Sequence, residues 1–362
     1  MRLKLHHLNQ LSYSLTQTIN FKVLVKKALS VFNYMIFLLL GVLFLWLVFR
    51  KQDPKEIMES IASADYLWIV LGIIAGIFSH IARAARWNIL IRSLGYKPRL
   101  TTTFYAVMTG YLANTAVPRL GEVTRCGVLS KKLNIPFTEV LGTMIAERIF
   151  DMIILLSLIV MVIAFQWKLV GSFMNEKILE PVSSNFESNI VPIIVIISVF
   201  VLFIVLLVIL WKKYRKLLQR YAFFRKFSEF AKGMVEGIKT IRKTKNKAGF
   251  LLYTLVIWGM YTLMIYLPFF ALEATSHLTF IDALTVMSIG SLGIVAPVPG
   301  GIGTYHWIVK AVLFELYGVS PMIAASFATI THAAQTIMII VVGGLSFLML
   351  FLQKNKTGHE SS

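Results

Sequence analysis

The chain has 362 residues, of which 57% are hydrophobic and only 15% are charged. Soluble domains carry roughly 45–50% apolar and about 25% charged residues, so this composition excludes a soluble globular enzyme and a disordered protein. The single cysteine, Cys126, excludes an intramolecular disulfide and a cysteine-based metal site. The formal net charge of +19, combined with the apolar excess, indicates an anionic membrane surface as a partner in place of nucleic acid.

The predicted elements along the chain are mostly membrane helices. Residues 1–32 carry five basic residues and no acidic one, which is typical of a segment that lies on an anionic membrane surface. A helix that crosses a bilayer needs about 20 mostly apolar residues. Six stretches qualify or nearly qualify, and they are residues 33–49, 66–91, 138–165, 190–211, 250–272 and 321–352.

Two further apolar stretches, residues 102–117 and 280–296, are too short to cross a bilayer comfortably. Each runs into a turn rich in proline and glycine, the first around Pro118 and the second around Pro299. We expect these stretches to dip into the bilayer and return. The sequence therefore predicts an all-α polytopic membrane protein with about six full spans and two re-entrant hairpins of broken helices.

The distribution of lysine and arginine predicts the orientation, because these residues mark the cytoplasmic side. Residues 212–249 hold 13 basic residues and two acidic ones, whereas residues 50–65 and 166–189 hold more acids than bases. Both termini are therefore predicted to face the cytoplasm. The membrane that we expect is a bacterial inner membrane. The predicted organisation is a basic surface segment, one membrane domain, a basic cytoplasmic loop within it and a cytoplasmic tail, over residues 1–32, 33–352, 212–249 and 353–362.

The two short stretches have similar surroundings. Val-Met-Thr in the first and Val-Met-Ser in the second stand before the turn, and each turn is followed by a short stretch, a proline and a long apolar helix. The charge count makes the first hairpin enter from the cytoplasm and the second from outside. These features favour an inverted-topology repeat whose broken helices meet near the bilayer midplane. Packed helical bundles also contain segments interrupted by glycine and proline, so an ordinary bundle is the alternative.

Charged residues stand inside these apolar segments, where they are costly and usually functional. They are Arg83, Arg86, Arg119, Glu122, Arg125, Glu147, Arg148 and Asp151. Asp151 is one helical turn from both Glu147 and Arg148, which predicts a buried network in which Arg148 pairs with the two carboxylates. The alternatives are a purely structural neutral cluster and, for the two arginines of the second span, side chains that reach back to the inner interface.

The glycine-rich second turn also predicts an anion site. Its glycines allow close backbone approach and leave free N–H groups at the start of the next helix. No Gly-Lys-Ser/Thr follows, so nucleotide binding is not expected. His306 follows the turn, and His332 lies in the last predicted span, where a hydrogen-bonded packing role is the alternative to a proton relay.

Several arginines thus converge with acids on the predicted re-entrant segments. Guanidinium groups match phosphate oxygens through two-point contacts, so this combination predicts a phosphate-bearing substrate that enters or crosses the bilayer. The sequence shows no cluster of metal ligands, no cofactor motif and no convincing pair of nucleophile and base. We therefore expect no metal, no cofactor and no enzyme activity.

Four motifs, in this order, resemble the membrane region of the lysylphosphatidylglycerol synthase/flippase family. They are Arg86-Trp87, Pro118-Arg119-Leu120-Gly121-Glu122 with Arg125, Glu147-Arg148 with Asp151, and Pro299-Gly300-Gly301-Ile302-Gly303. The resemblance covers nearly the whole chain and implies a helical domain that translocates lipids. Fused members carry a soluble transferase domain that this chain is expected to lack. Where the family often has an acid shortly after the glycine-rich turn, this chain has His306.

The sequence therefore predicts a transporter or flippase for a phosphate-bearing lipid, such as a phospholipid, a polyprenyl phosphate or a glycolipid. The candidate headgroup-binding residues are the eight charged residues named above together with Gly300, Gly301, Gly303 and His306. One alternative is a non-transporting membrane partner that recruits a soluble lipid- or glycan-modifying enzyme at its cytoplasmic face. An intramembrane lipid-modifying enzyme is a further alternative, which the missing pair of nucleophile and base disfavours.

Overall fold

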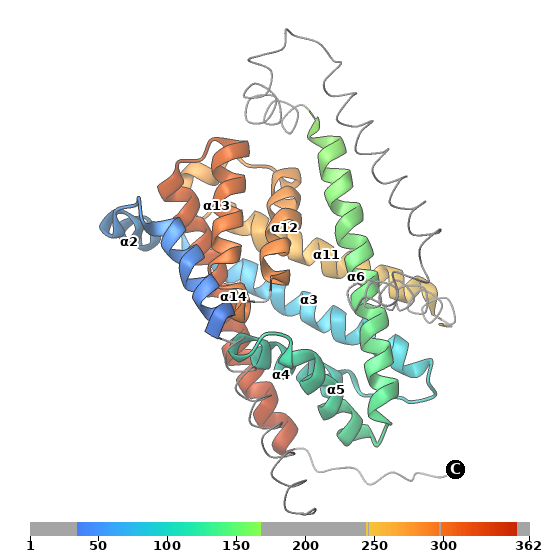
Figure 1. The fold of residues 1–362 in the computed structure, drawn as a ribbon. Helices are drawn as coiled ribbons and strands as arrows, with labels where there is room; N and C mark the ends of the chain where they lie inside the picture. Colours follow the sequence, from blue (N-terminus) through green and yellow to red (C-terminus); the bar gives the residue numbers. More distant parts are fainter. Residues whose placement is uncertain (1–34, 168–243, 245, 297, 353–362) are drawn as a thin grey trace, which may run out of the picture.

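The computed structural model describes residues 35–167, 244, 246–296 and 298–352. These residues form helices joined by short turns, and none of them lies in a strand, which confirms the predicted all-α class (Figure 1). Some predictions fall outside the described residues. They concern the surface segment 1–32, the span 190–211, most of the loop 212–249 and the tail 353–362.

Four of the described helices are long and apolar enough to cross a membrane, and they are α3 (Tyr66–Arg92), α6 (Phe137–Phe165), α11 (Lys247–Phe269) and α14 (Pro321–Leu352). The shortest has 23 residues, and at about 1.5 Å per residue such a helix extends over roughly 35 Å. Each lies within three residues of the apolar stretch that predicted it. The length of an apolar run is a local property, so the sequence located these helices well.

The first predicted span, residues 33–49, is not a single long helix like the four above but the first part of a bent pair of helices. The helix Met35–Phe49 is followed by α2 (Pro54–Ala62), and the two are bent by 87° at the break between them. Asp53 caps α2, because its carboxylate accepts a hydrogen bond from the Lys55 N–H at 2.8 Å. If this bent pair counts as one span, the described residues hold five spans instead of four.

The two short apolar stretches each belong to a pair of helices. The pairs are α4 (Leu100–Ala116) with α5 (Leu120–Leu133), and α12 (Phe280–Val295) with α13 (Thr304–Tyr317). The predicted turns join them, and in each turn the residue after the proline has the left-handed backbone conformation, Arg119 with φ 64° and Gly300 with φ 58°. Glycine adopts this conformation at no steric cost, whereas an arginine there is uncommon.

Both pairs cross closely at a glycine. A Cβ atom on Gly121 would overlap the carbonyl oxygen of Gly110, and one on Gly293 would stand 2.9 Å from the carbonyl oxygen of Thr304. The Asn114 side-chain oxygen accepts a hydrogen bond from the Gly121 N–H at 2.6 Å, and the Thr304 hydroxyl donates to the Gly293 carbonyl at 2.6 Å. Backbone contact and a polar bond therefore hold each pair together.

In the view of Figure 1, α3 and α11 run across the middle of the described part, with α12 and α13 above them and α4 and α5 below them. α11 packs along α3 in the opposite direction, since Gly72 near the start of α3 lies beside Pro268 near the end of α11. α14 packs against α4 and α13, and α12 packs against α6. Buried apolar side chains form one cluster mainly within α3 to α6 and another mainly within α11 to α14. A smaller cluster of Ala75, Met108, Met264 and Met338 connects the two halves.

Candidate functional site

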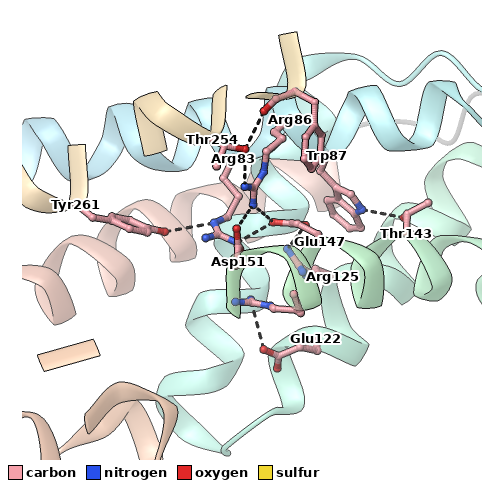
Figure 2. A network of polar contacts seen from close by, with 12 residues as sticks. Arg83, Arg86, Trp87, Glu122, Arg125, Thr143, Glu147, Asp151, Thr254 and Tyr261 are labelled. Carbon is pink, nitrogen blue, oxygen red and sulfur yellow. Dashed lines mark hydrogen bonds and ion pairs between the residues drawn. The ribbon is translucent and has the colours of Figure 1, made fainter. Parts of the chain in front are cut away.

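The centre of the candidate site is an ion network between α3 and α6 (Figure 2). Arg83 Nη1 lies 2.7 Å from Glu147 Oε1 and 2.8 Å from Asp151 Oδ2. Arg86 Nη2 lies 2.6 Å from Asp151 Oδ1 and 3.3 Å from Glu147 Oε1. All four side chains are buried. The spacing of three residues on α3 and four on α6 places each pair on one helix face, so the two faces meet.

α11 supplies neutral hydrogen-bond acceptors to the same arginines. Arg83 Nε donates to the Tyr261 hydroxyl at 3.3 Å, and Arg86 Nη1 donates to the Thr254 hydroxyl at 3.1 Å. These two residues are seven apart in a largely apolar helix, and this spacing puts them on one face. Sequence reasoning missed both, although polar groups at this spacing were the available signal. With two positive and two negative charges, this part of the network is neutral, although Arg86 Nε is buried without a hydrogen-bond partner among the described residues.

Arg125 on α5 lies beside this network and is bonded differently. Its side chain is 3% exposed, and Nη1 lies 3.4 Å from Glu147 Oε2. None of its three guanidinium nitrogens has a hydrogen-bond partner among the described residues. The guanidinium carbon stands 4.7 Å from the ring centre of Trp87, whose indole N–H donates to the Thr143 hydroxyl at 3.0 Å. Arg125 is thus held by an anchored aromatic ring while its donors stay unused.

A second ion pair lies at the edge of the cluster. Arg148 Nη2 is 3.4 Å from Glu122 Oε1, and the two side chains are 37% and 25% exposed. The predicted pairing of Arg148 with Glu147 and Asp151 is therefore wrong. Arg148 follows Glu147 directly, and adjacent helical residues do not face each other, so it turns from the face that meets α3 toward α5.

The remaining predicted residues lie outside this network. Arg119 is exposed at the start of α5 and takes no part in the ion pairs described above. The glycine-rich turn contacts the end of α4, where a Cβ atom on Gly300 would stand 3.9 Å from Thr115 Cα. Gly301 and Gly303 both have positive φ, of 73° and 83°. The turn and the arginine cluster thus share α4 as a neighbour, without a direct bond between them in the described residues.

The two histidines near the turn form a group of their own. The ring centres of His306 and His332 are 4.6 Å apart, and both side chains are buried. His332 Nε2 is 2.9 Å from the Gly300 carbonyl oxygen, and His306 Nδ1 accepts a long hydrogen bond of 3.4 Å from the Gly303 N–H. These bonds hold the shape of the turn, which agrees with the packing role considered for His332.

The comparisons with known proteins match a membrane region and membrane proteins. A family model described as the lysylphosphatidylglycerol synthase TM region matches residues 34–343. A UPF0104 membrane protein of Methanocaldococcus jannaschii is 21% identical over 324 residues, which are 87% of this chain and 94% of that protein. One from Pyrococcus horikoshii is 24% identical over 85% of this chain and 93% of its own length. No solved structure matches the chain.

A glycosyltransferase, AglD of Haloferax volcanii, matches over only part of its length. It is 25% identical over 349 residues, which are 90% of this chain and 55% of that protein. The matched part therefore corresponds to little more than half of the glycosyltransferase.

Proposed function

Because the chain belongs to the lysylphosphatidylglycerol synthase transmembrane-region family, we propose that it moves a phosphate-bearing lipid between the leaflets of a membrane. The protein is a polytopic membrane protein, and its relatives include archaeal membrane proteins. The proposed headgroup site is the arginine-rich cluster of α3, α5 and α6. The proposed location is a bacterial inner membrane, with both termini on its cytoplasmic side, which is the orientation that the charge distribution predicts.

The observation that carries this proposal is that the buried guanidinium group of Arg125 makes no hydrogen bond among the described residues. A buried guanidinium without hydrogen bonds is costly, because its five N–H donors lose water, and for Arg125 only the long ion pair with Glu147 and the Trp87 ring offset this loss. Arg83 and Arg86 already hold Glu147 and Asp151, so Arg125 is not needed to neutralise them. A phosphate group supplies two oxygens at the spacing that the planar guanidinium fork binds, and it would satisfy the unused donors.

Along α5, the charged side chains become more deeply buried toward Arg125. Arg119 is exposed, Glu122 is half-buried and Arg125 is buried, each three residues after the last. In the proposed mechanism a headgroup first meets Arg119, then separates Arg148 from Glu122 and reaches Arg125. A separated Arg148 can contact the same phosphate. We expect Arg119→Ala to slow transport in part, since it removes the first contact only.

The arrangement of the helices supports an inverted repeat, which would let this site face either side. Helices α3 to α6 have 27, 17, 14 and 29 residues, and helices α11 to α14 have 23, 16, 14 and 32. The contacts also correspond, because α4 packs against α14 as α12 packs against α6. The antiparallel packing of α3 and α11 is expected if one copy is inverted. In this proposal α4–α5 and α12–α13 are opposed re-entrant hairpins, as the sequence predicted.

Reconstitution into liposomes tests the transport function. Fluorescent phosphatidylglycerol is added with other labelled lipids, and a quencher outside the vesicles reports how fast each lipid changes leaflet. Arg125→Met should reduce the rate at least about tenfold, and Arg125→Lys should restore it only in part, because lysine cannot make a planar two-point contact. Lys131→Ala, an exposed change on the same helix, is the matched control.

A stability measurement separates binding from folding. Methionine has a similar length, packs on Trp87 and needs no hydrogen bonds, so Arg125→Met should keep or raise the melting temperature. Normal transport by a folded Arg125→Met protein would contradict the proposed site. Failure of the wild-type protein to move any lipid of the panel would contradict the proposed function.

The second candidate function is recruitment of a soluble enzyme without transport. It is favoured by the match to AglD, in which a region like this chain belongs to a longer glycosyltransferase. Replacing the basic residues of segment 212–249 by glutamine distinguishes the two functions. Loss of cellular function with an unchanged transport rate in liposomes would favour recruitment.

A further inference from the structure

The cluster around Arg125 has one positive charge more than its acids can neutralise. Among the described residues it holds four guanidinium groups and three carboxylates, joined by the ion pairs given above. Arg83 and Arg86 are matched by Glu147 and Asp151, and the pair at the edge is neutral. The unmatched charge is assigned to Arg125, because all three of its guanidinium nitrogens lack a hydrogen-bond partner among the described residues, whereas Arg86 and Arg148 each have one such nitrogen, Nε.

From this charge balance we infer that the site takes a phosphate with a single negative charge, which means a phosphodiester. The inference rests on the proposed lipid transport and narrows its substrate class. Charge compensation decides the occupant because an unneutralised charge is far more costly in a low-dielectric site than in water. A diester monoanion brings the cluster to neutrality. A phosphate monoester, with nearly two charges above pH 7, leaves it negative.

Rearrangement of the ion pairs does not alter this balance. If Arg148 leaves Glu122 to contact a second phosphate oxygen, Glu122 remains as an unmatched carboxylate in a partly buried position. The total charge of the cluster is the same before and after this exchange. Arg148 therefore cannot neutralise the second negative charge of a dianionic phosphate, because its move exposes the charge of Glu122. A monoanionic phosphate is already neutralised by Arg125.

The geometry around Arg125 agrees with a diester. The guanidinium carbon stands 4.7 Å from the ring centre of Trp87, and its buried nitrogens make no hydrogen bond among the described residues, so the unused N–H groups are what it can offer to phosphate oxygens. A diester presents two unesterified oxygens, which match two N–H groups of such an edge. Glycerophospholipids and polyprenyl phosphates esterified to a second group both carry this diester. An unesterified polyprenyl phosphate does not.

The experiment compares phosphatidylglycerol with phosphatidic acid of the same acyl chains, in proteoliposomes at pH 8. Phosphatidic acid is then a dianionic monoester, since the second pKa of a phosphate monoester is about 6. The wild-type protein should move the diester at least about tenfold faster, a preference equivalent to roughly 1.4 kcal/mol. Arg125 should be required for whatever phosphatidic acid is moved.

Glu122→Gln is the decisive variant, because it raises the charge of the cluster by one while keeping the side-chain shape. It should reduce the preference to equality or reverse it. Glu139→Gln is the matched control, since it removes the same charge from an exposed position at the start of α6. It should leave the preference unchanged. The double variant Arg148→Gln/Glu122→Gln retains the original net charge and should retain the preference, which keeps the test available if Glu122→Gln folds poorly.

The outcomes separate this inference from the proposed function. Equal or faster movement of phosphatidic acid by the wild-type protein, with Arg125 still required, would overturn the charge-balance inference and leave lipid transport intact. An unchanged preference in folded Glu122→Gln would also overturn it. Absence of all lipid movement would instead overturn the proposed function.

Discussion

Arg86→Ala is expected to destabilise the protein strongly through the α3–α6 network. Arg86 Nη2 lies 2.6 Å from Asp151 Oδ1, and its Nη1 donates to Thr254. Once Arg86 is removed, Glu147 and Asp151 share Arg83, at 2.7 and 2.8 Å, and Glu147 also keeps its longer contact of 3.4 Å with Arg125. Two buried carboxylates are then held mainly by one guanidinium.

The magnitude follows from the strength of a buried pair. At an effective dielectric constant of about 20, two opposite charges about 4 Å apart attract each other by ~4 kcal/mol. Measured losses from removing one partner of a buried pair are about 3–5 kcal/mol, and the fully buried guanidinium of Arg86 belongs in this range. With about 2 °C per kcal/mol for a large domain, the melting temperature should fall by roughly 6–10 °C.

Thermal unfolding in detergent measures this effect against Arg92→Ala, which removes the same residue type from an exposed position at the end of α3. The double variant Arg86→Ala/Asp151→Ala should recover part of the loss, because it removes the stranded carboxylate together with its partner. Equal melting temperatures for Arg86→Ala and Arg92→Ala would refute the buried network. Strict additivity of the two single changes would show that the side chains do not interact.

Three further changes probe other parts of the structure. Arg148→Ala should cost no more than about 1 kcal/mol in thermal unfolding, because its pair is partly exposed, and a loss near that of Arg86→Ala would mean that it is buried in the network after all. Gly121→Ala should lower the melting temperature clearly more than Gly127→Ala, since a Cβ atom overlaps backbone at the first position and meets nothing within 4 Å at the second. In a background without the native cysteine, an impermeant maleimide added to intact cells should label Glu56→Cys and spare Lys131→Cys, and the reverse pattern would invert the proposed orientation.

The positions of the helices were largely predictable from the sequence, because they follow from local properties. An apolar run of the right length forms a helix in a membrane whatever its neighbours are, so α3, α6, α11 and α14 lie close to their predicted bounds. The turns at Pro118 and Pro299 were predictable for the same reason, since proline and glycine interrupt a helix locally. The 87° bend after Phe49 was not, because its direction depends on packing.

The sequence predicted which of the charged residues share a helix face, but it did not predict which residues they pair with. Helical spacing showed that Arg83 and Arg86 share a face and that Glu147 and Asp151 share another. No property of either segment indicates that these two faces meet, since they are separated by about 60 residues and two short helices. The pairing of Arg148 was therefore assigned to its sequence neighbours, and the structure assigns it to Glu122.

The sequence by itself determined that this protein lies in a membrane, where its long helices are and which charged residues the bilayer must accommodate. These properties depend on composition and on spacing within one helix. Only the tertiary structure decided which charges cancel, because ion pairing depends on distances between helices that are remote in the chain. That Arg83 and Arg86 are matched while Arg125 keeps its donors unused is a consequence of how α3, α5 and α6 meet.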